Sequence, residues 1–362
     1  MNTKDIGVLH VITTIELGGA EKQLLTLVEK QVESGLHVHI IYIKGKPDLI
    51  FAFKKLGVSI SQSPWKNSLA QIKFLRSYVI NNRINLVHAH LPRAELLSTL
   101  VLVNVPIVIS RHNAEPFFPR APKLLSQALS RLVCLRAKTV IAITDAVRFY
   151  LIESREVKDT KKVTVIRYGV NLRTSNQREN SVAIREERLK LLSIGRLVEQ
   201  KDYPTTLNAL ALLSKSGKKF DYNVIGEGIL QKSLIQQGHN LGIEQSISWI
   251  GKTNQVIDYL NESNVFILSS RYEGFGLVLL EAMKQGTPIL ASNCPAIVEV
   301  LGNNYSGLFP VGDPNALAKL LLSCFDLNFL QGLLDQTNNR IHLFDASFMA
   351  KEMLKVYQNA LN

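Results

Sequence analysis

The sequence has few of the features that mark a secreted or membrane-spanning chain. Its 362 residues include three cysteines, Cys134, Cys294 and Cys324, with no CxxC spacing, and three thiols cannot all pair within one chain. This scarcity favours a reducing, cytosolic compartment. The longest apolar stretch, residues 96–109, is interrupted by polar residues and a proline, which makes it too short and too broken to cross a bilayer.

Several motifs are also missing. The N-terminal residues are typical of a first strand that contains Asp5, and not of a signal peptide. Zinc-finger spacings, RNP-type aromatic strands, a P-loop and a complete GxGxxG fingerprint are absent, as is an acidic DxD triplet. We therefore expect no nucleic-acid partner, no nicotinamide or other cofactor and no metal.

Acidic residues are outnumbered, and the formal net charge is +12. Residues 111–190 hold 17 Lys and Arg against 8 Asp and Glu, so most of the excess lies in the middle of the chain. Such an excess suits anionic lipid surfaces or phosphorylated substrates. Phe117 and Phe118 lie among these cations, and they are either residues of a membrane-contacting segment or part of the core.

Short apolar runs alternate with longer amphipathic ones along the whole chain, which predicts parallel sheets covered by helices. The first six predicted strands are residues 8–12, 38–43, 86–88, 107–109, 140–143 and 163–166. The second six are residues 191–194, 222–225, 247–250, 265–268, 289–291 and 307–309.

The length suggests two domains. Polar residues dominate 171–188, and we place the linker there. The predicted domains are residues 1–170 and 189–345, and residues 346–362 form a helix at the end of the chain. Both domains are expected to be doubly wound, Rossmann-like α/β units that bind ligands at the carboxyl ends of their strands.

The stretch from Ser269 to Gly286 follows a predicted strand and leads into a helix. Its turn, Gly274-Phe275-Gly276, points backbone N–H groups and the positive end of the helix at a bound anion. Glu273 and Glu281 flank this turn, and they are suited to accept hydrogen bonds from sugar or ribose hydroxyls. The alternative is that both glutamates are surface charges of an amphipathic helix.

Other candidates also follow predicted strands. Arg196 and Lys201 come after residues 191–194 and are suited to neutralise a diphosphate, although such a pair is often solvated surface. His112 follows residues 107–109, as a functional or a structural histidine. His88 and His90 have a metal-compatible spacing, but with no third ligand nearby we interpret them as packing residues.

Taken together, these residues resemble the retaining, GT-B-fold glycosyltransferases of family 4 over nearly the full length of the chain. The resemblance is carried by residues 18–21 (GGAE), 87–90 (VHAH), 195–197 (GRL) with Lys201, 226–228 (GEG) and, above all, the E-x7-E pair of Glu273 and Glu281. It implies two Rossmann-like domains facing a central cleft, with the C-terminal helix packed back on the first domain.

The resemblance also implies roles for individual residues. Glu281 would bind the ribose, Glu273 a hydroxyl of the donor sugar, and His112 would lie near the transferred sugar. Arg196 and Lys201 would neutralise the diphosphate. The remaining expected substrate-binding residues are Gly18, Gly19, Glu227, Gly274, Phe275, Gly276 and Leu277. One departure is Tyr168, which precedes Gly169 where many members have asparagine, and we expect it to affect hinge contacts only.

The function expected from this resemblance is transfer of a sugar from a nucleoside-diphosphate sugar, with UDP favoured, to a hydroxyl of a glycan or lipid-linked acceptor. The configuration at the anomeric carbon would be retained. The setting would be polysaccharide or lipopolysaccharide synthesis by a cytoplasmic enzyme, peripheral at the inner face of the cytoplasmic membrane. The alternatives are a cytosolic enzyme that makes a small soluble glycoside, and a silent sugar-nucleotide-binding partner protein.

Overall fold

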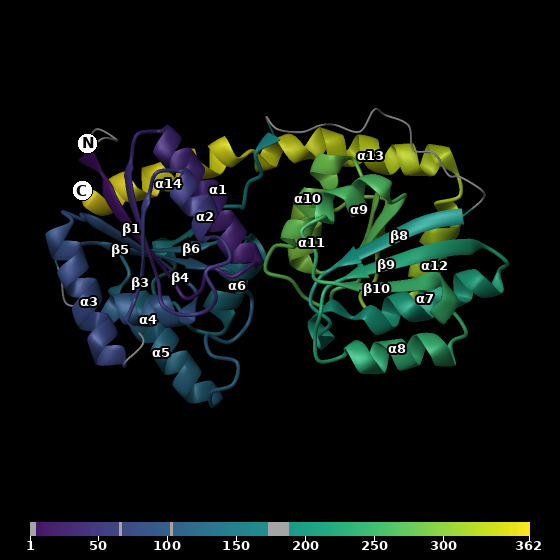
Figure 1. Ribbon diagram of the computed structural model, residues 1–362, viewed down its shortest axis with the longest axis horizontal. Helices are drawn as coiled ribbons and strands as arrows, with labels where there is room; N and C mark the ends of the chain where they lie inside the picture. The colour runs from purple at the N-terminus through teal and green to yellow at the C-terminus, as the bar shows by residue number, and fades with distance from the viewer. Residues whose placement is uncertain (1–4, 65–66, 102–103, 173–187) are drawn as a thin grey trace. The chain divides into compact units, whose positions relative to one another are not determined.

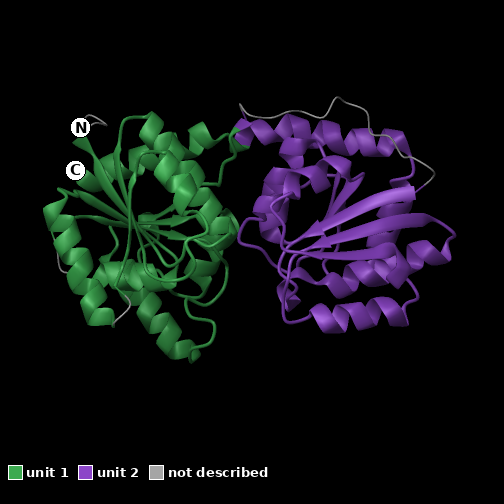
Figure 2. Ribbon diagram, in the orientation of Figure 1, with its two compact units in different colours: residues 1–171, 344–362 green, residues 172–343 purple. Residues whose placement is uncertain are grey.

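The computed structural model describes residues 5–64, 67–101, 104–172 and 188–362, and it divides into two compact units (Figure 2). Unit 1 comprises residues 1–171 and 344–362, and unit 2 comprises residues 172–343. Each unit is a parallel sheet with helices on its faces (Figure 1), which confirms the predicted α/β class. The predicted linker falls almost entirely outside the described residues and stays a prediction.

Unit 1 contains a seven-stranded, all-parallel sheet of order β3-β2-β1-β4-β5-β6-β7. Its central strands are buried over their whole length, because helices cover both faces of such a sheet. Six of the strands were predicted, and β3 was not. The strands are β1 (Gly7–Ile12), β2 (His37–Tyr42), β3 (Ser59–Gln62), β4 (Leu86–His90), β5 (Ile107–Arg111), β6 (Thr139–Ala142) and β7 (Val163–Val165).

The helices of unit 1 come from both ends of the chain. The Asn67 and Thr144 side chains cap α3 and α6 by accepting hydrogen bonds from Ala70 N and Val147 N, so these two helices begin where a short polar side chain satisfies an end group. The helices are α1 (Gly19–Glu33), α2 (Ile50–Lys55), α3 (Ser68–Asn81), α4 (Pro92–Leu100), α5 (Lys123–Arg136), α6 (Asp145–Glu153) and α14 (Ala346–Leu361).

The chain returns to unit 1 through a close backbone crossing. Val170 N donates to Phe344 O at 2.8 Å, and Ala346 N donates to Val170 O at 3.0 Å. A Cβ on Gly169 would lie 2.6 Å from Ala346 Cα, so only glycine fits at this crossing. The helix that follows, α14, packs on α1, and the Tyr357 hydroxyl accepts a hydrogen bond from Gln31 Nε2 at 3.0 Å.

Unit 2 repeats the architecture with a six-stranded parallel sheet of order β10-β9-β8-β11-β12-β13. Its strands are β8 (Arg188–Ile194), β9 (Lys219–Ile225), β10 (Ile247–Gly251), β11 (Val265–Leu268), β12 (Ile289–Ser292) and β13 (Leu308–Phe309). Its helices are α7 (Tyr203–Lys215), α8 (Gln231–Asn240), α9 (Val256–Glu262), α10 (Leu277–Gln285), α11 (Pro295–Leu301), α12 (Pro314–Ser323) and α13 (Leu327–Ile341).

In both sheets the strand order reverses at one point. That point lies between the neighbouring strands β1 and β4 in unit 1, and between β8 and β11 in unit 2. The chain crosses it from β3 to β4 and from β10 to β11. At such a switch point the loops leaving the two neighbouring strands diverge to opposite faces, and a crevice opens at their carboxyl ends. The topology therefore points to the loops after β1 and β4, and after β8 and β11, as ligand-binding segments.

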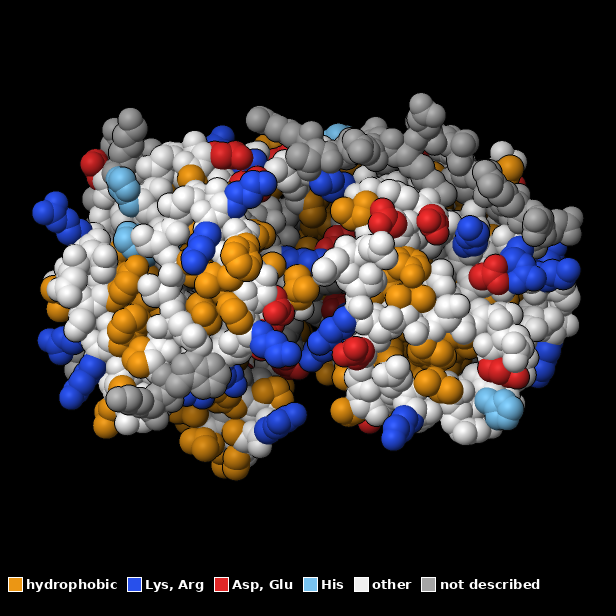
Figure 3. Space-filling model, viewed as in Figure 1, with side chains coloured by type: hydrophobic (Ala, Val, Ile, Leu, Met, Phe, Trp, Pro, Cys, Tyr) orange, Lys and Arg blue, Asp and Glu red, His pale blue; other side chains and the backbone are white. Residues whose placement is uncertain are grey.

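Among the described residues, none of the helices is by itself long and apolar enough for a membrane span, although the bent pair Pro314–Ser323 and Leu327–Phe344 passes on length and composition together. The surface of unit 1 carries a gathering of hydrophobic side chains at its lower end, where Figure 1 places α5 (Figure 3).

Candidate active site

The candidate site in unit 2 is formed by the two loops at the switch point between β8 and β11. Arg271 N donates to Gln200 O at 2.8 Å, and Gln200 Nε2 donates to Tyr272 O at 3.1 Å. The buried Ser269 hydroxyl donates to the carbonyls of Lys201 and Asp202 at 2.9 and 3.0 Å. These bonds fix the loops 195–202 and 269–276 against each other.

At the centre of these loops, Lys201 and Glu273 form an ion pair. Lys201 Nζ lies 2.5 Å from Glu273 Oε1, and Ser270 Oγ donates to the same oxygen at 2.6 Å. Only 14% of the Lys201 side chain and 7% of that of Glu273 are exposed. The attraction within a nearly buried pair is screened much less than within a surface pair. Of the two interpretations of Glu273, a surface charge is therefore wrong.

The glycines around this pair are explained by close backbone approach. A Cβ on Gly226 would lie 2.0 Å from Gly195 O, and one on Gly228 would lie 2.2 Å from Leu197 O. Leu197 N donates to Glu227 O at 3.0 Å, which ties the loops after β8 and β9 together. The GEG motif thus has a packing function in unit 2, whatever else it binds.

Helix α10 begins at Leu277, after Gly276 in the left-handed conformation (φ 79°, ψ 55°). That conformation favours glycine, and it sets the first turn of α10, where helix N–H groups point outward, at the end of the loop that holds Glu273. The Phe275 side chain is buried and anchors the turn. Glu281 lies in the second turn of α10 and is half-buried.

Two further predicted residues of unit 2 lie at the surface. Arg196 is exposed, and its Nη2 donates to Gln200 Oε1 at 3.4 Å. Glu227 is exposed and lies 3.7 Å from Lys252 Nζ. The structure thus brings Lys201 and Glu273 into direct contact, while the roles expected of Arg196 and Glu227 stay predictions.

In unit 1 the loop after β1 leads through Gly18 into α1, which begins at Gly19. A Cβ on Gly18 would lie 2.3 Å from Glu21 Oε2. The Glu21 carboxylate accepts a hydrogen bond from Thr14 Oγ1 at 2.6 Å, and burial raises the pKa of this carboxyl above its usual range. Gly18 and Gly19 therefore stand at a helix N-terminus on the unit 1 switch point, a geometry suited to an anion.

His112 follows β5 and is hydrogen-bonded to Tyr168, the residue that we expected to affect only hinge contacts. Its Nδ1 is hydrogen-bonded to the Tyr168 hydroxyl, and the two rings stack. The His112 Nε2 atom is buried and has no hydrogen-bond partner among the described residues. Tyr168 is the residue at which the sequence departs from the family pattern that it resembles, and the structure places it against a candidate catalytic residue. Tyr168 thus contacts more than the hinge. The expectation that the departure leaves the chemistry unaffected stays a prediction.

The packing interpretation of His88 and His90 missed their neighbour His10. Nitrogens of these three buried histidines all lie within 4.8 Å of one another. His10 Nδ1 lies 2.9 Å from His90 Nε2, whereas two imidazole nitrogens on one tetrahedral zinc ion are about 3.3 Å apart. The expectation of no third ligand was wrong, but the geometry is that of a hydrogen-bonded cluster.

Gln31, Tyr357 and Ser110 complete this cluster. Gln31 Oε1 lies 2.8 Å from His10 Nε2, and the Tyr357 hydroxyl lies 2.6 Å from His88 Nδ1. Ser110 Oγ lies 2.8 Å from His88 Nε2. Helices α1 and α14 thus contact the strands through a continuous polar network, which crosses the face of the sheet toward His112.

The buried histidines lead to a prediction about acid stability. Burial lowers the pKa of His10 to about 4, and burial together with Arg111 lowers the pKa of His112 to about 3. Between those values and the unfolded pKa of 6.5, the unfolded state binds more protons. The stability that the neutral, buried His10 and His112 contribute is therefore fully present above pH 6.5, and it is lost as the pH falls below that value. Each should contribute a loss of about 2 kcal/mol between pH 7 and pH 5.

Denaturant unfolding at the two pH values, with imidazole ¹⁵N shifts, checks this prediction. Glu95 acts in the opposite direction, because burial raises the pKa of its carboxyl to about 7 and the folded state gains a proton as the pH falls. Glu95→Gln should therefore steepen the acid loss. Protonation of His10 or His112 at pH 5 in the folded protein would contradict the prediction.

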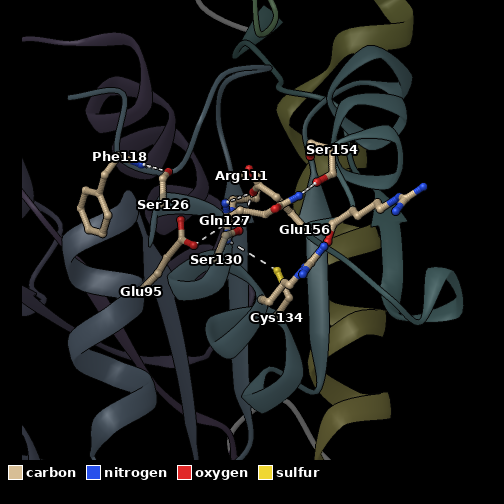
Figure 4. Close-up of polar contacts among 11 residues, drawn as sticks. Glu95, Arg111, Phe118, Ser126, Gln127, Ser130, Cys134, Ser154 and Glu156 are labelled. Atoms are coloured by element: carbon tan, nitrogen blue, oxygen red, sulfur yellow. Dashed lines mark hydrogen bonds and ion pairs between the residues drawn. The ribbon is translucent and has the colours of Figure 1, made fainter. Parts of the chain in front are cut away.

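Beneath the loop of His112 lies a buried ion cluster (Figure 4). Arg111 Nε lies 2.8 Å from Glu95 Oε2, and Arg111 Nη1 lies 3.1 Å from Glu156 Oε2. The α5 residue Ser130 also contacts the cluster, accepting from Arg111 Nη2 at 2.9 Å and donating to Glu156 at 2.5 Å. Two carboxyls share one guanidinium, which agrees with the raised pKa of Glu95.

Above this cluster a cavity of about 630 Å³ opens beside His112. Phe117 lines it but is only 2% exposed, and its ring centroid lies 4.3 Å from Arg111 Cζ. Phe117 is thus a core residue. Contact of the surrounding basic segment with a membrane stays a prediction. The other lining residues include Leu91, Pro92, Leu96, Pro116 and Phe118, with Lys44 and Arg93 as cations.

Comparison with known proteins identifies two family models that together span most of the chain. The model described as Glycosyltransferase Family 4 matches residues 17–174, and that described as Glycosyl transferases group 1 matches residues 175–338. The amylovoran biosynthesis glycosyltransferase AmsK of Erwinia amylovora is 31% identical over 171 residues, which is 45% of this chain and 42% of AmsK.

Two further similarities cover nearly the whole chain. A phosphatidyl-myo-inositol mannosyltransferase of Mycolicibacterium smegmatis is 23% identical over 94% of this chain and 90% of its own length. The crystal structure of Anabaena HepE in complex with UDP and glucose superposes with a TM-score of 0.82 at 17% identity, over 98% of this chain and all of HepE. This structural similarity shows the fold alone.

Proposed function

Since the chain is a glycosyltransferase of the group 1 type with the GT-B fold, we propose that it transfers a hexosyl group from a UDP-sugar with retention of configuration. The observation that carries this proposal is the Lys201–Glu273 ion pair at the unit 2 switch point, 2.5 Å between Nζ and Oε1. It combines a fixed cation for a diphosphate with a fixed carboxylate for a sugar hydroxyl. The UDP bound in the HepE structure supports the choice of nucleotide.

In the proposed reaction, the bond between the anomeric carbon and the β-phosphate oxygen breaks, and the diphosphate leaves with the electron pair. An acceptor hydroxyl attacks from the same face, and its proton passes to the departing phosphate oxygen. Lys201, assisted by Arg196, stabilises the negative charge that develops on the leaving group. Glu273 orients the sugar through a hydroxyl, and Glu281 accepts from the ribose.

The remaining predicted residues take supporting roles in this proposal. Amides of the turn at Gly274–Leu277 hold the sugar and phosphate, and Glu227 stays a substrate-binding candidate. In unit 1, Gly18 and Gly19 are proposed to approach the phosphates, and His112 to lie near the transferred sugar. Because its pKa is about 3, His112 is neutral at pH 7 and would act by hydrogen bonding, not as an acid.

The acceptor is proposed to be a hydroxyl of a glycan or of a lipid-linked glycan used in surface polysaccharide or lipopolysaccharide synthesis. The apolar cavity beside His112, with Lys44 and Arg93 among its lining residues, supports an acceptor that carries both apolar and phosphate groups. The proposed location is the cytoplasm, peripheral to the inner face of the membrane.

Incubation of the purified protein with UDP-glucose and other UDP-sugars, with UDP release measured, tests the proposal. Proton NMR of the product then shows whether the anomeric configuration is retained. Release of UDP into a small soluble glycoside would favour the soluble-acceptor alternative. UDP binding with no turnover of any sugar nucleotide would favour a silent binding partner.

The ribose contact leads to a separate prediction. Glu281→Ala should weaken UDP binding by roughly 10- to 150-fold, because it removes hydrogen bonds to a charged acceptor that contribute about 1.5–3 kcal/mol. Isothermal titration with UDP measures this directly. Glu262→Ala, at the end of the neighbouring helix α9, is the matched control and should bind as the wild type does. Unchanged affinity in Glu281→Ala would remove this residue from the donor site.

A further inference from the structure

Helix α5 exposes four leucines to water, while two serines lie on its buried side. Two of its four buried residues are serines: Ser130 contacts the Arg111 cluster, and Ser126 Oγ accepts from Phe118 N at 2.9 Å (Figure 4). Its water-facing side is apolar, with exposed fractions of 80% for Leu124, 51% for Leu125, 42% for Leu132 and 60% for Leu135. A globular protein normally turns the apolar stripe inward.

The ion cluster explains why α5 buries polar side chains. A guanidinium and two carboxyls beneath α5 need polar neighbours, because a buried charge without hydrogen bonds is costly. Ser130 and Cys134 supply them, with Sγ 3.5 Å from Arg111 Nη2. Holding the cluster thus requires Ser130 and Cys134 to face inward, but it does not require leucines outside. Neutral polar residues there would preserve the same contacts, so the leucines need another explanation.

Charge around α5 indicates what covers this face. Residues 117–144 contain no Asp or Glu and five cations, of which Arg120, Lys123, Arg136 and Lys138 are exposed. An apolar helix face with flanking cations is the pattern of segments that lie in the headgroup boundary of an anionic bilayer. A second copy of this chain fits poorly, because two such faces would bring like charges together.

We propose that the outward leucines of α5 dock unit 1 on an anionic lipid surface. The occupant is the bilayer itself, with the leucines reaching into the headgroup boundary and the four exposed cations contacting lipid phosphates. The inference rests on the proposed peripheral location and names the surface responsible for it. It makes no use of the donor site in unit 2.

Vesicle co-sedimentation of the full chain tests this inference. The protein should bind phosphatidylglycerol-containing vesicles at low salt and bind phosphatidylcholine vesicles much more weakly. Binding should fade at about 0.5 M salt, because the screening length is then only a few ångströms. The double variant Leu132→Ser/Leu135→Ser should weaken binding roughly tenfold or more, since both side chains lose their transfer into lipid.

Two controls test whether vesicle binding depends specifically on the leucines of α5. Leu69→Ser, on α3 of the same unit and 72% exposed in the wild type, should bind vesicles as the wild type does. UDP titration of the α5 variant should be unchanged, so that a failure of lipid docking is distinguished from a failure of the donor site. No binding to anionic vesicles at low salt would overturn the proposal. So would an α5-dependent dimer in sedimentation analysis without vesicle binding.

Discussion

Lys201→Ala is expected to lower turnover by about 10²–10³-fold, the usual cost of removing one charge-stabilising group from a transition state. The effect is large because the Lys201 ammonium is nearly buried and held by Glu273, so no solvent cation replaces it at the moment the diphosphate leaves. Initial rates with a UDP-sugar that supports turnover measure it. Turnover should also persist in excess chelator, because in the proposed mechanism side chains neutralise the charge of the leaving group.

The controls separate chemistry from folding. Lys201→Arg keeps the charge and should retain more turnover than alanine, whereas Lys215→Ala, at an exposed position at the end of α7, should leave turnover unchanged. Denaturant unfolding of Lys201→Ala accounts for the stability lost when Glu273 is left unpaired. Wild-type turnover in folded Lys201→Ala, or activity that only a divalent metal restores, would contradict the proposed role.

The alternation of apolar and amphipathic runs predicted twelve strands and the α/β class, because burial on both faces of a parallel strand demands a continuous apolar run. Strand β3 escaped prediction for the same reason. Three of its four residues, Ser59, Ser61 and Gln62, are polar, and the strand lies at the sheet edge, where only one neighbour, β2, stabilises it. The start of α6 was also not predicted, although the Thr144 cap is a recognisable start signal.

The candidate site was predicted from motifs, but its contacts were not. Lys201 and Glu273 are 72 residues apart, and only the adjacency of β8 and β11 brings them together. Ser270 was missed because serine beside a strand end is too common to carry information. Likewise, nothing in local spacing places His10 beside His90 or Tyr168 against His112. Those contacts depend on strand order and on the segment from β7 to the backbone crossing at Gly169.

The buried cluster of unit 1 leads to the largest predicted loss of stability. Arg111→Met should destabilise unit 1 by about 3–5 kcal/mol, because it leaves the carboxyls of Glu95 and Glu156 buried without a cation. Glu95→Gln should destabilise the protein less than Arg111→Met does. Burial already raises the pKa of Glu95 to about 7, so a neutral side chain there resembles the state it partly occupies.

A triple variant distinguishes the net contribution of the charged cluster to stability from the penalty of leaving its carboxyls unpaired. Replacing Arg111 by methionine together with Glu95 and Glu156 by leucine removes every charge, and it should recover most of the stability lost in Arg111→Met. Denaturant unfolding of the three variants at pH 7 measures the difference. If the triple variant is less stable than Arg111→Met, the cluster contributes through its hydrogen bonds to α5 and not through paired charge. Equal stability of Arg111→Met and the wild type would mean that water reaches these carboxyls, contrary to their burial.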